Sequence, residues 1–269
     1  MCGYAVRMFR KGLLAIMLSS ASSSFADPLV IAHRGGAHAA PENTIAAFVQ
    51  GWADGADGAE GDFYLSADGH VVCIHDRNTK KLANKSIDVT KSTLEQLKAL
   101  DVGYKKNKKF TGERVPTLEE VMATVPEGKK LFIEIKDSER IVAPIKKILD
   151  ASSIAPEQIA IISFDRSVIR ESKKQMPDIK AYWIFNQKTF MEHGATKVIE
   201  MAKAIGADGI DTEAHKGVSK IFVKMLRNAG LEVHCWTVND AKTGKRFAEM
   251  GFDSITTDRP KLILEALGR

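Results

Sequence analysis

Two histidines and an arginine stand where apolar runs of the sequence stop, at positions where polar side chains are costly unless they are paired or bind something. The run 29–32 ends at His33 and Arg34, and the run 71–74 ends at His75. Imidazoles exchange protons near neutral pH, and a guanidinium holds anions such as phosphate. The pattern predicts an anion site with two acid–base groups, and it leaves open which histidine is the acid.

Three carboxylates accompany these residues in strand-like segments, at Glu60, Asp62 and Glu134. Alternation along a strand places Glu60 and Asp62 on one face. An all-oxygen cluster without cysteine favours Ca²⁺ or Mg²⁺ over structural zinc, and the residues do not choose between the two ions. The alternative is a salt-bridged network with Arg34 and Lys136, which would leave two converging histidines unexplained.

A metal ion, fixed cations and paired histidines together suit the cleavage of a phosphodiester. One imidazole could take a proton from the attacking oxygen while the other gives one to the leaving alkoxide. Attack by water and attack by a neighbouring substrate hydroxyl, through a cyclic phosphate, both stay open. His38 in a loop, His215 in a surface stretch and His234 deeper in a strand are weaker candidates.

The segment 31–44 is interpreted as a strand, a loop and the start of a helix. Asn43 or Thr44 can cap that helix, whose N-terminus is expected to help hold the anion. Gly35 and Gly36 are expected to keep side chains away from the phosphate. Apolar residues then recur with a helical period, at Ile45, Phe48, Val49 and Trp52.

The rest of the chain alternates between strand-like and helix-like segments. Strands are predicted at 29–33, 58–63, 131–136, 159–164, 181–185, 207–211, 232–238 and 253–257. Helices are predicted near 45–52, 93–100, 117–124 (capped by Thr117), 140–151, 166–175, 197–205, 219–228, 241–250 and 261–267. Eight such units fit a (β/α)8 TIM barrel, whose reactive residues lie at the C-terminal ends of its strands. A doubly wound open sheet is the runner-up, but no Gly-x-Gly-x-x-Gly follows the first strand.

A hairpin and a polar excursion interrupt the alternation after the second strand. Asp68-Gly69 is a turn signal, and 70–75 reads as the returning strand. Residues 66–115 are therefore predicted to form a small insertion. Elsewhere, the segments 55–58 and 206–209 share the sequence Gly-Ala-Asp-Gly, which is attributed to equal demands of a helix-to-strand turn rather than to duplication.

Composition and charge restrict the class of protein. Residues 1–26 have a basic start, an apolar core too short to span a bilayer and a small-x-small end, which predicts a secretory signal peptide and a periplasmic or secreted protein. The formal net charge of +5 falls to +2 without them, which argues against nucleic-acid binding. Residues 27–269 are expected to form one domain, with Cys73 and Cys235 as buried thiols and no stable membrane insertion.

The motifs resemble those of the glycerophosphodiester phosphodiesterases, in the family's order and over nearly all of residues 27–269. The matching stretches are His33-Arg34-Gly35, Pro41-Glu42-Asn43-Thr44, Glu60-Gly61-Asp62, His75-Asp76, Glu134-Ile135-Lys136, Ser163-Phe164 and Trp236-Thr237-Val238-Asn239. The resemblance implies a barrel of the phospholipase-C-like type. It also implies hydrolysis of deacylated phospholipids to sn-glycerol 3-phosphate and an alcohol.

The resemblance also implies roles for individual residues. His33 and His75 would be the acid–base pair. One divalent ion would be held by Glu60, Asp62 and Glu134. Arg34 and Lys136 would bind the phosphate of the substrate. Phe164 and Trp236 would contact its glycerol side. Glu42, also a substrate-binding residue, would support the metal or the substrate.

Two other functions are weighed against this one. A phospholipase D-like enzyme acting on lysolipids or sphingolipids would need an apolar lip at the mouth of the site, and the Lys-rich segment 105–109 argues against it. An exported binding protein without catalysis would show broken motif positions, and none is broken. The preferred head group and the oligomeric state stay open.

Overall fold

The computed structural model describes residues 26–269, so the predicted signal peptide, 1–26, lies outside the described residues except for Ala26. The strands are β1 (Leu29–Ala32), β2 (Gly58–Leu65), β3 (Val71–Cys73), β4 (Lys130–Ile135), β5 (Ile159–Ser163), β6 (Lys180–Phe185), β7 (Gly209–Glu213), β8 (Glu232–Trp236) and β9 (Ser254–Thr257). The α-helices are α1 (Ile45–Ala53), α2 (Leu94–Lys98), α3 (Leu118–Met122), α4 (Val142–Asp150), α5 (Arg166–Gln175), α6 (Gln187–Ala204), α7 (Lys220–Asn228), α8 (Ala241–Ala248) and α9 (Pro260–Ala266).

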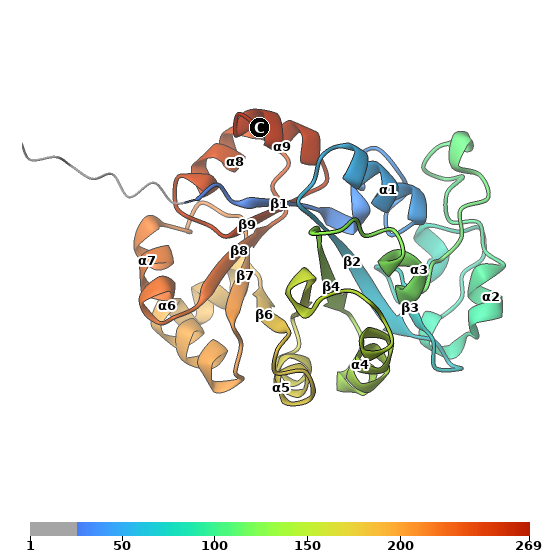
Figure 1. Ribbon diagram of the computed structural model, residues 1–269, viewed down its shortest axis with the longest axis horizontal. Coiled ribbons are helices and arrows are strands. Elements are labelled where there is room, and N and C mark those ends of the chain that lie inside the picture. The colour runs from blue at the N-terminus through green and yellow to red at the C-terminus, as the bar shows by residue number, and fades with distance from the viewer. Residues whose placement is uncertain (1–25) are drawn as a thin grey trace, which may run out of the picture.

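All the described strands except β3 form a closed parallel barrel. The sheet runs in the order β1-β9-β8-β7-β6-β5-β4-β2, and pairing of β1 with β2 closes it. The helices surround the barrel, as Figure 1 shows. The predicted (β/α)8 TIM barrel is confirmed, and every predicted barrel strand lies within two residues of the observed one.

Apolar side chains fill two layers of the barrel. One layer packs between the strands and the surrounding helices and includes Phe48, Leu131 and Phe247, all fully buried. The other is a smaller cluster, made by Ile31, Phe132, Ala160, Ile162, Tyr182 and Ile184. Each fully buried side chain of this size contributes about 1.5–3 kcal/mol to folding. The hydrophobic residues thus hold the barrel and leave the strand ends to polar groups.

The hairpin and the insertion lie beside the barrel, at the right of Figure 1. Strand β3 runs antiparallel to β2, with Phe63 opposite Cys73. The insertion has a small core of its own, formed by Val72, Ile74, Ala83, Val89, Leu97, Leu100, Val102 and Val115. Helix α2 is capped by Thr93 and α3 by Thr117, each with a complete capping box. The predicted cap at Thr117 is confirmed.

The two Gly-Ala-Asp-Gly segments make the same turn. The carboxylate of Asp57 accepts a hydrogen bond from the backbone N–H of Val30 at 2.9 Å, and that of Asp208 accepts one from Ala181 at 2.9 Å. Asp253 does the same for Val233 at 2.7 Å, although its turn has a different sequence. The shared sequence therefore reflects one geometric requirement: the aspartate of the turn must accept a hydrogen bond from the backbone of the neighbouring strand.

Helix α6 differs most from the prediction. It covers Gln187–Ala204 instead of 197–205, and its backbone is interrupted at Gly194, where φ is 70°. The first half has few apolar residues and begins with a cap from Asn186, so its sequence lacks a helical hydrophobic period. No helix within residues 26–269 is long and apolar enough to cross a bilayer.

Smaller expectations have mixed outcomes. Val49 belongs to the predicted apolar stripe of α1, but its side chain is exposed because the helix turns that face outward.

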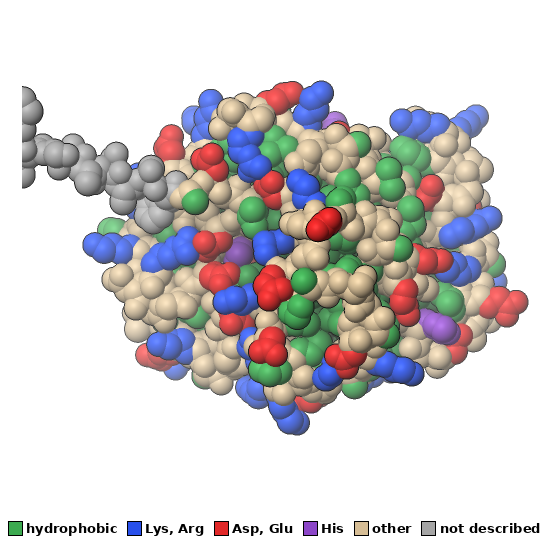
Figure 2. Space-filling view, in the orientation of Figure 1, with side chains coloured by type: hydrophobic (Ala, Val, Ile, Leu, Met, Phe, Trp, Pro, Cys, Tyr) green, Lys and Arg blue, Asp and Glu red, His purple; other side chains and the backbone are tan. Residues whose placement is uncertain are grey.

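Cys73 and Cys235 are buried free thiols, as predicted. On the face drawn in Figure 2, basic and acidic side chains are interspersed, in keeping with a small net charge.

Candidate active site

The barrel brings the predicted site residues together at the C-terminal ends of its strands. A cavity of about 190 Å³ is lined there by eight of them: His33, Arg34, Glu60, His75, Glu134, Lys136, Phe164 and Trp236. Asp62 is fully buried beside this cavity, where its carboxylate lies 3.5 Å from both Arg34 and Lys136. Glu42 lines an adjoining cavity that shares His33 and Arg34.

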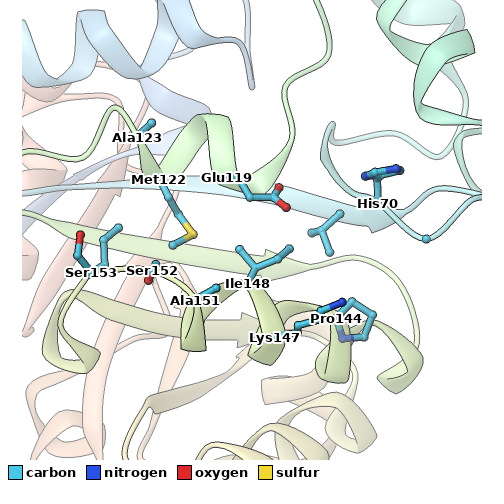
Figure 3. A pocket seen from close by; sticks show the side chains of 13 residues that line it. His70, Glu119, Met122, Ala123, Pro144, Lys147, Ile148, Ala151, Ser152 and Ser153 are labelled. Carbon is cyan, nitrogen blue, oxygen red and sulfur yellow. The ribbon is translucent and has the colours of Figure 1, made fainter.

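A larger cavity, of about 700 Å³, lies outside the barrel and holds none of these residues. Figure 3 shows it between the hairpin, α3 and α4, with His70, Glu119, Met122, Lys147 and Ile148 among its labelled side chains. Its lining is mostly apolar, and its titratable side chains, His70, Glu119 and Lys147, belong to no group of potential metal ligands within residues 26–269. The smaller cavity, which holds eight of the predicted residues, is therefore the candidate active site.

The three predicted ligands form a compact carboxylate cluster. One oxygen from each of Glu60, Asp62 and Glu134 lies within 4.8 Å of the others. Glu60 Oε1 and Asp62 Oδ1 are buried, and neither has a hydrogen-bond partner among the described residues. Converging carboxylate oxygens, two of which are buried and accept no hydrogen bond, fit a hard divalent cation. This donor set could hold one such ion.

Burial and mutual repulsion shift the pKa values of the cluster in different directions. Burial, together with the charges of Asp62 and Glu134, raises the pKa of Glu60 well above its ordinary value. Burial and the charge of Asp62 raise the pKa of Glu134 to about 7. Burial alone would also raise the pKa of Asp62, but Lys136 and Arg34 hold it below its ordinary value. Without an ion, the cluster therefore retains protons at mildly acidic pH.

Two cations compensate part of this negative charge. Lys136 donates to Glu134 Oε1 at 2.8 Å, and Arg34 donates from Nη1 to Glu42 Oε1 at 2.9 Å. Burial opposes both charges, but the surrounding carboxylates outweigh it and raise the pKa of each group. Glu42 thus reaches the site through Arg34 and lies outside the carboxylate cluster.

Each of the two predicted histidines is held by an aspartate. His75 Nδ1 lies 2.6 Å from Asp76 Oδ1, and Lys136 Nζ approaches its Nε2 at 3.3 Å. Because a carboxylate only accepts hydrogen bonds, Nδ1 carries the proton and Nε2 presents a lone pair. Burial lowers the pKa of His75. This imidazole is therefore neutral near pH 7.

The aspartate that holds His33 was not predicted. Asp258 Oδ1 lies 2.6 Å from His33 Nδ1, and Asn239 donates to the other carboxylate oxygen at 2.6 Å. Burial would raise the pKa of Asp258, but its hydrogen bond to His33 and the positive charge that this ring can carry lower it. Asp258 directly follows β9, so the strand-end rule that identified the other residues could also have found it.

The aromatic pair forms one wall of the cavity. The rings of Phe164 and Trp236 meet edge to face, with centroids 5.6 Å apart. Phe164 is 43% exposed and therefore lies at the mouth, where Lys136 Nζ is 5.7 Å from its ring centroid. An apolar wall next to fixed cations suits a ligand that is anionic at one end and carbon-based at the other.

The loop after β1 is fixed by backbone contacts, and Gly35 has a different role from the one expected. Its φ is +80°, and a Cβ there would lie 2.6 Å from Phe48 N, so glycine is required by the approach of α1. Arg34 and Asn43 also have positive φ values, and Asn43 donates to Asp62 at 2.7 Å. The loop is thereby held between α1 and the carboxylate cluster.

Helix α1 begins as predicted but does not offer its N-terminus to an anion. Thr44 is the cap and accepts from Ala47 N, while Glu113 of the insertion accepts from Ala46 N at 3.4 Å. A carboxylate of the chain itself thus occupies this helix end. The expected role of this helix N-terminus in holding a substrate anion stays a prediction, and the contact with Glu113 does not favour it.

The other histidines lie away from the carboxylate cluster. His38 is exposed in its loop, and His234 is buried, with Nδ1 2.8 Å from Ser254 Oγ. His215 was expected at the surface but is only 9% exposed. The centroid of its ring lies 5.6 Å from the ring centroid of Phe190. Phe190 belongs to the first half of α6, which the sequence pattern did not predict.

A fourth buried carboxyl group was missed. Asp211 lines the same cavity and is 1% exposed, and burial together with the charge of Glu134 raises its pKa well above the ordinary value. Thr256 of β9 lines the cavity beside the predicted residues as well. Asp211 is the last residue of the predicted strand 207–211, so the strand-end rule offered a signal for it.

Comparison with known proteins places this site in a family. Residues 33–262 match the model of the glycerophosphoryl diester phosphodiesterase family. A glycerophosphodiester phosphodiesterase of Caldanaerobacter subterraneus subsp. tengcongensis is 34% identical over 247 residues, covering 88% of this chain and 96% of the relative. A Bacillus subtilis glycerophosphodiester phosphodiesterase is 28% identical, covering 93% and 92%.

Solved structures agree on the fold. An Oleispira antarctica phosphodiesterase, in complex with the product sn-glycerol-3-phosphate, superposes with a TM-score of 0.81 at 25% identity, covering 90% of this chain and 98% of that one. A glycerophosphodiester phosphodiesterase from Thermotoga maritima gives a TM-score of 0.73 at 23% identity, covering 89% and 98%. Both share the barrel architecture.

The raised pKa of Glu134 predicts how stability depends on pH when divalent ions are chelated. Between its ordinary value of 4.5 and about 7, the folded protein holds a proton that the unfolded chain has released. Raising the pH through this window should therefore lower the free energy of unfolding, by up to about 3 kcal/mol. Urea unfolding at pH 5.0, 6.0 and 7.5 in EDTA measures it.

Glu134→Gln should reduce the fall in the free energy of unfolding between pH 5.0 and 7.5. Glu119→Gln, at an exposed position, should leave that fall unchanged. A wild-type stability that stays constant or rises between pH 5.0 and 7.5 would contradict the burial-driven shift.

Proposed function

Since the chain belongs to the glycerophosphoryl diester phosphodiesterase family, we propose that it hydrolyses deacylated phospholipids to sn-glycerol 3-phosphate and an alcohol such as choline, ethanolamine or glycerol. The observation that carries the proposal is the arrangement of His33 and His75. Each ring is bonded through Nδ1 to an aspartate, and both rings line one cavity with the carboxylate cluster and two cations.

The proposal includes one divalent cation held by Glu60, Asp62 and Glu134. The buried oxygens of Glu60 and Asp62 that accept no hydrogen bond from residues 26–269, and the spacing of the cluster, support it. Bound there, the ion would supply Lewis-acid polarisation of the phosphoryl group. Ca²⁺ and Mg²⁺ both match the donor set, and a titration of the metal-free protein with each ion decides between them.

The phosphate is bound by Arg34 and Lys136. Both groups stay charged throughout the working pH range, and their hydrogen bonds to Glu42 and Glu134 fix them at the mouth of the cavity. They stabilise the negative charge that develops on the phosphoryl oxygens in the transition state. Their fixed positions also orient the diester between the two histidines.

The protons move through the Nε2 atoms of the two histidines. Asp76 and Asp258 hold the opposite side of each ring, which fixes the tautomer and directs Nε2 to the substrate. One imidazole takes the proton of the attacking oxygen, and the other protonates the leaving alcohol. The glycerol end of the substrate lies against Phe164 and Trp236.

Substitution of either histidine should abolish most of the activity. With glycerophosphocholine or glycerophosphoglycerol and added Ca²⁺ or Mg²⁺, His33→Asn and His75→Asn should each lower kcat by about 10²–10⁴-fold, because proton transfer is lost. His70→Asn is the matched control, since His70 is exposed on the same hairpin as His75. The release of sn-glycerol 3-phosphate is measured with a coupled dehydrogenase assay.

The proposal fails if wild-type protein forms no sn-glycerol 3-phosphate with either ion, or if His33→Asn retains full activity. Binding of the diester without turnover would indicate a catalytically silent binding protein. Faster turnover of lysolipids than of glycerophosphodiesters would indicate a phospholipase D-like enzyme.

We also propose export across the cytoplasmic membrane, on the basis of residues 1–26. The chain expressed in a bacterial host should be recovered from the periplasm or medium with Asp27 as its first residue. Recovery of uncleaved protein from the cytoplasm alone would contradict this proposal.

A further inference from the structure

A further cavity adjoins the active site, between the end of β4 and the insertion. Its volume is about 680 Å³, and its charged side chains are four cations and one carboxylate: Arg77, Lys91, Lys136, Arg140 and Asp137. Lys136 also lines the active-site cavity, so the two cavities meet at a residue that binds the phosphate in the proposed function. We call this further cavity the cationic groove.

The inner wall of the cationic groove continues the strands that carry the carboxylate cluster. Side chains alternate along β2, so Tyr64, which lines the groove, lies on the same face as Asp62. The backbone N–H of Lys136 donates to the carbonyl of Phe63 at 3.1 Å, which holds the end of β4 beside this part of β2. The groove therefore lies directly beyond the carboxylate cluster, where β2 extends out of the barrel into the hairpin.

The cations of the groove have hydrogen-bond donors that the chain itself does not use. Arg77 Nε lies 3.2 Å from both carboxylate oxygens of Asp88, and its two Nη atoms donate to no group within residues 26–269. Arg140 donates to Asp137 from Nε at 3.1 Å and from Nη2 at 2.9 Å, and its Nη1 has no acceptor in that part of the chain. Lys91 is exposed and forms no ion pair with a described residue. Guanidinium groups that are held on one side and open on the other suit the oxygens of a phosphate.

The alcohol end of the substrate is the end that faces this groove. Phe164 and Trp236, against which the glycerol end lies in the proposed function, line the active-site cavity, and neither of them lines the groove. With the glycerol on that aromatic wall and the phosphate at Lys136, the groove is open to the alcohol on the other side of the phosphate. The groove thus contacts the part of the substrate that leaves.

The other cavity that adjoins the active site suits an anion less well. Two carboxylates, those of Glu42 and Asp258, line it, and Lys106 Nζ in its wall already donates to the carbonyl of Ala37 at 2.7 Å. Its exposed cation, Arg259, therefore provides a direct comparison with the cations of the groove.

We propose that the cationic groove binds a phosphate group on the leaving alcohol, so that the enzyme prefers glycerophosphodiesters whose alcohol carries a second phosphate. This inference rests on the proposed function and names its substrate class. The bond that breaks is still the ester bond between phosphorus and the alcohol oxygen, and that oxygen still takes up a proton. An alcohol with a permanent positive charge, such as choline, is repelled by the same cations.

The test compares two substrates that differ by one phosphate. Glycerophosphoglycerol is compared with its derivative phosphorylated on the outer hydroxyl of the leaving glycerol, at low salt and with saturating Ca²⁺ or Mg²⁺. The wild-type protein should have a kcat/KM about 10-fold higher for the phosphorylated substrate, because several cations face the added charge. The difference should shrink as added NaCl screens it. Loss of the diester signal in phosphorus NMR follows both reactions, since the leaving alcohol of the derivative is itself a glycerol phosphate.

Matched variants locate the preference in the groove. The double variant Lys91→Gln and Arg140→Gln should lower the preference to about 3-fold or less, and should change kcat/KM for glycerophosphoglycerol by less than about 2-fold. Arg259→Gln, in the other adjoining cavity, and Lys108→Gln, exposed on the insertion and outside the groove, should leave the preference intact. All four side chains are exposed, so the variants are expected to fold.

Binding without turnover separates this inference from the proposed function. In calorimetry with the same divalent ion, His75→Asn protein should bind the phosphorylated substrate about 10-fold more tightly, and the double variant in this background should lose that difference. The inference is overturned if the wild-type preference is below about 3-fold, if the double variant keeps it, or if Arg259→Gln or Lys108→Gln lowers it as much. Failure of the proposed function appears differently, as wild-type protein that cleaves neither substrate, and calorimetry then still tests the groove.

Discussion

Repulsion among three buried carboxylates is the constraint on which the rest of the site depends. Oxygens of Glu60, Asp62 and Glu134 lie within 4.8 Å of one another, and all three side chains are buried. Such a cluster can persist only with protons, nearby cations or a metal ion to offset its charge. Lys136 and Arg34 supply part of this compensation, and the raised pKa values of Glu60 and Glu134 show that they do not supply all of it.

Different layers of the barrel provide stability and carry the charged groups. Apolar packing between strands and helices stabilises the fold, so the strand ends can carry unfavourable charge. Close approach of α1 to Gly35 fixes the loop that carries His33, and the antiparallel hairpin of β2 and β3 leads directly into His75. The two imidazoles come from separate segments, and each is oriented by its own aspartate. Stability and reactivity are thus supplied by different residues.

The sequence predicted the barrel and the convergence of the candidate site residues because both depend on local patterns. Apolar runs that end in charged residues mark strand ends, and strand ends meet at one edge of a parallel barrel. Contacts between distant segments left no such pattern. Glu113 reaches Ala46 across 67 residues, so its occupation of the helix N-terminus could not be anticipated. The first half of α6 lacks a hydrophobic period, and the burial of His215 beneath it was missed for the same reason.

A proton count on metal binding tests the central claim most directly. The metal-free protein is titrated with Ca²⁺ or Mg²⁺ by calorimetry at pH 6.0, in buffers of different ionisation enthalpy. The account predicts one ion per chain, with release of about one proton or more, because the ion replaces protons on Glu134 and Glu60. Absence of binding, or binding without proton release, would contradict the claim that the carboxylate cluster is completed by a divalent cation.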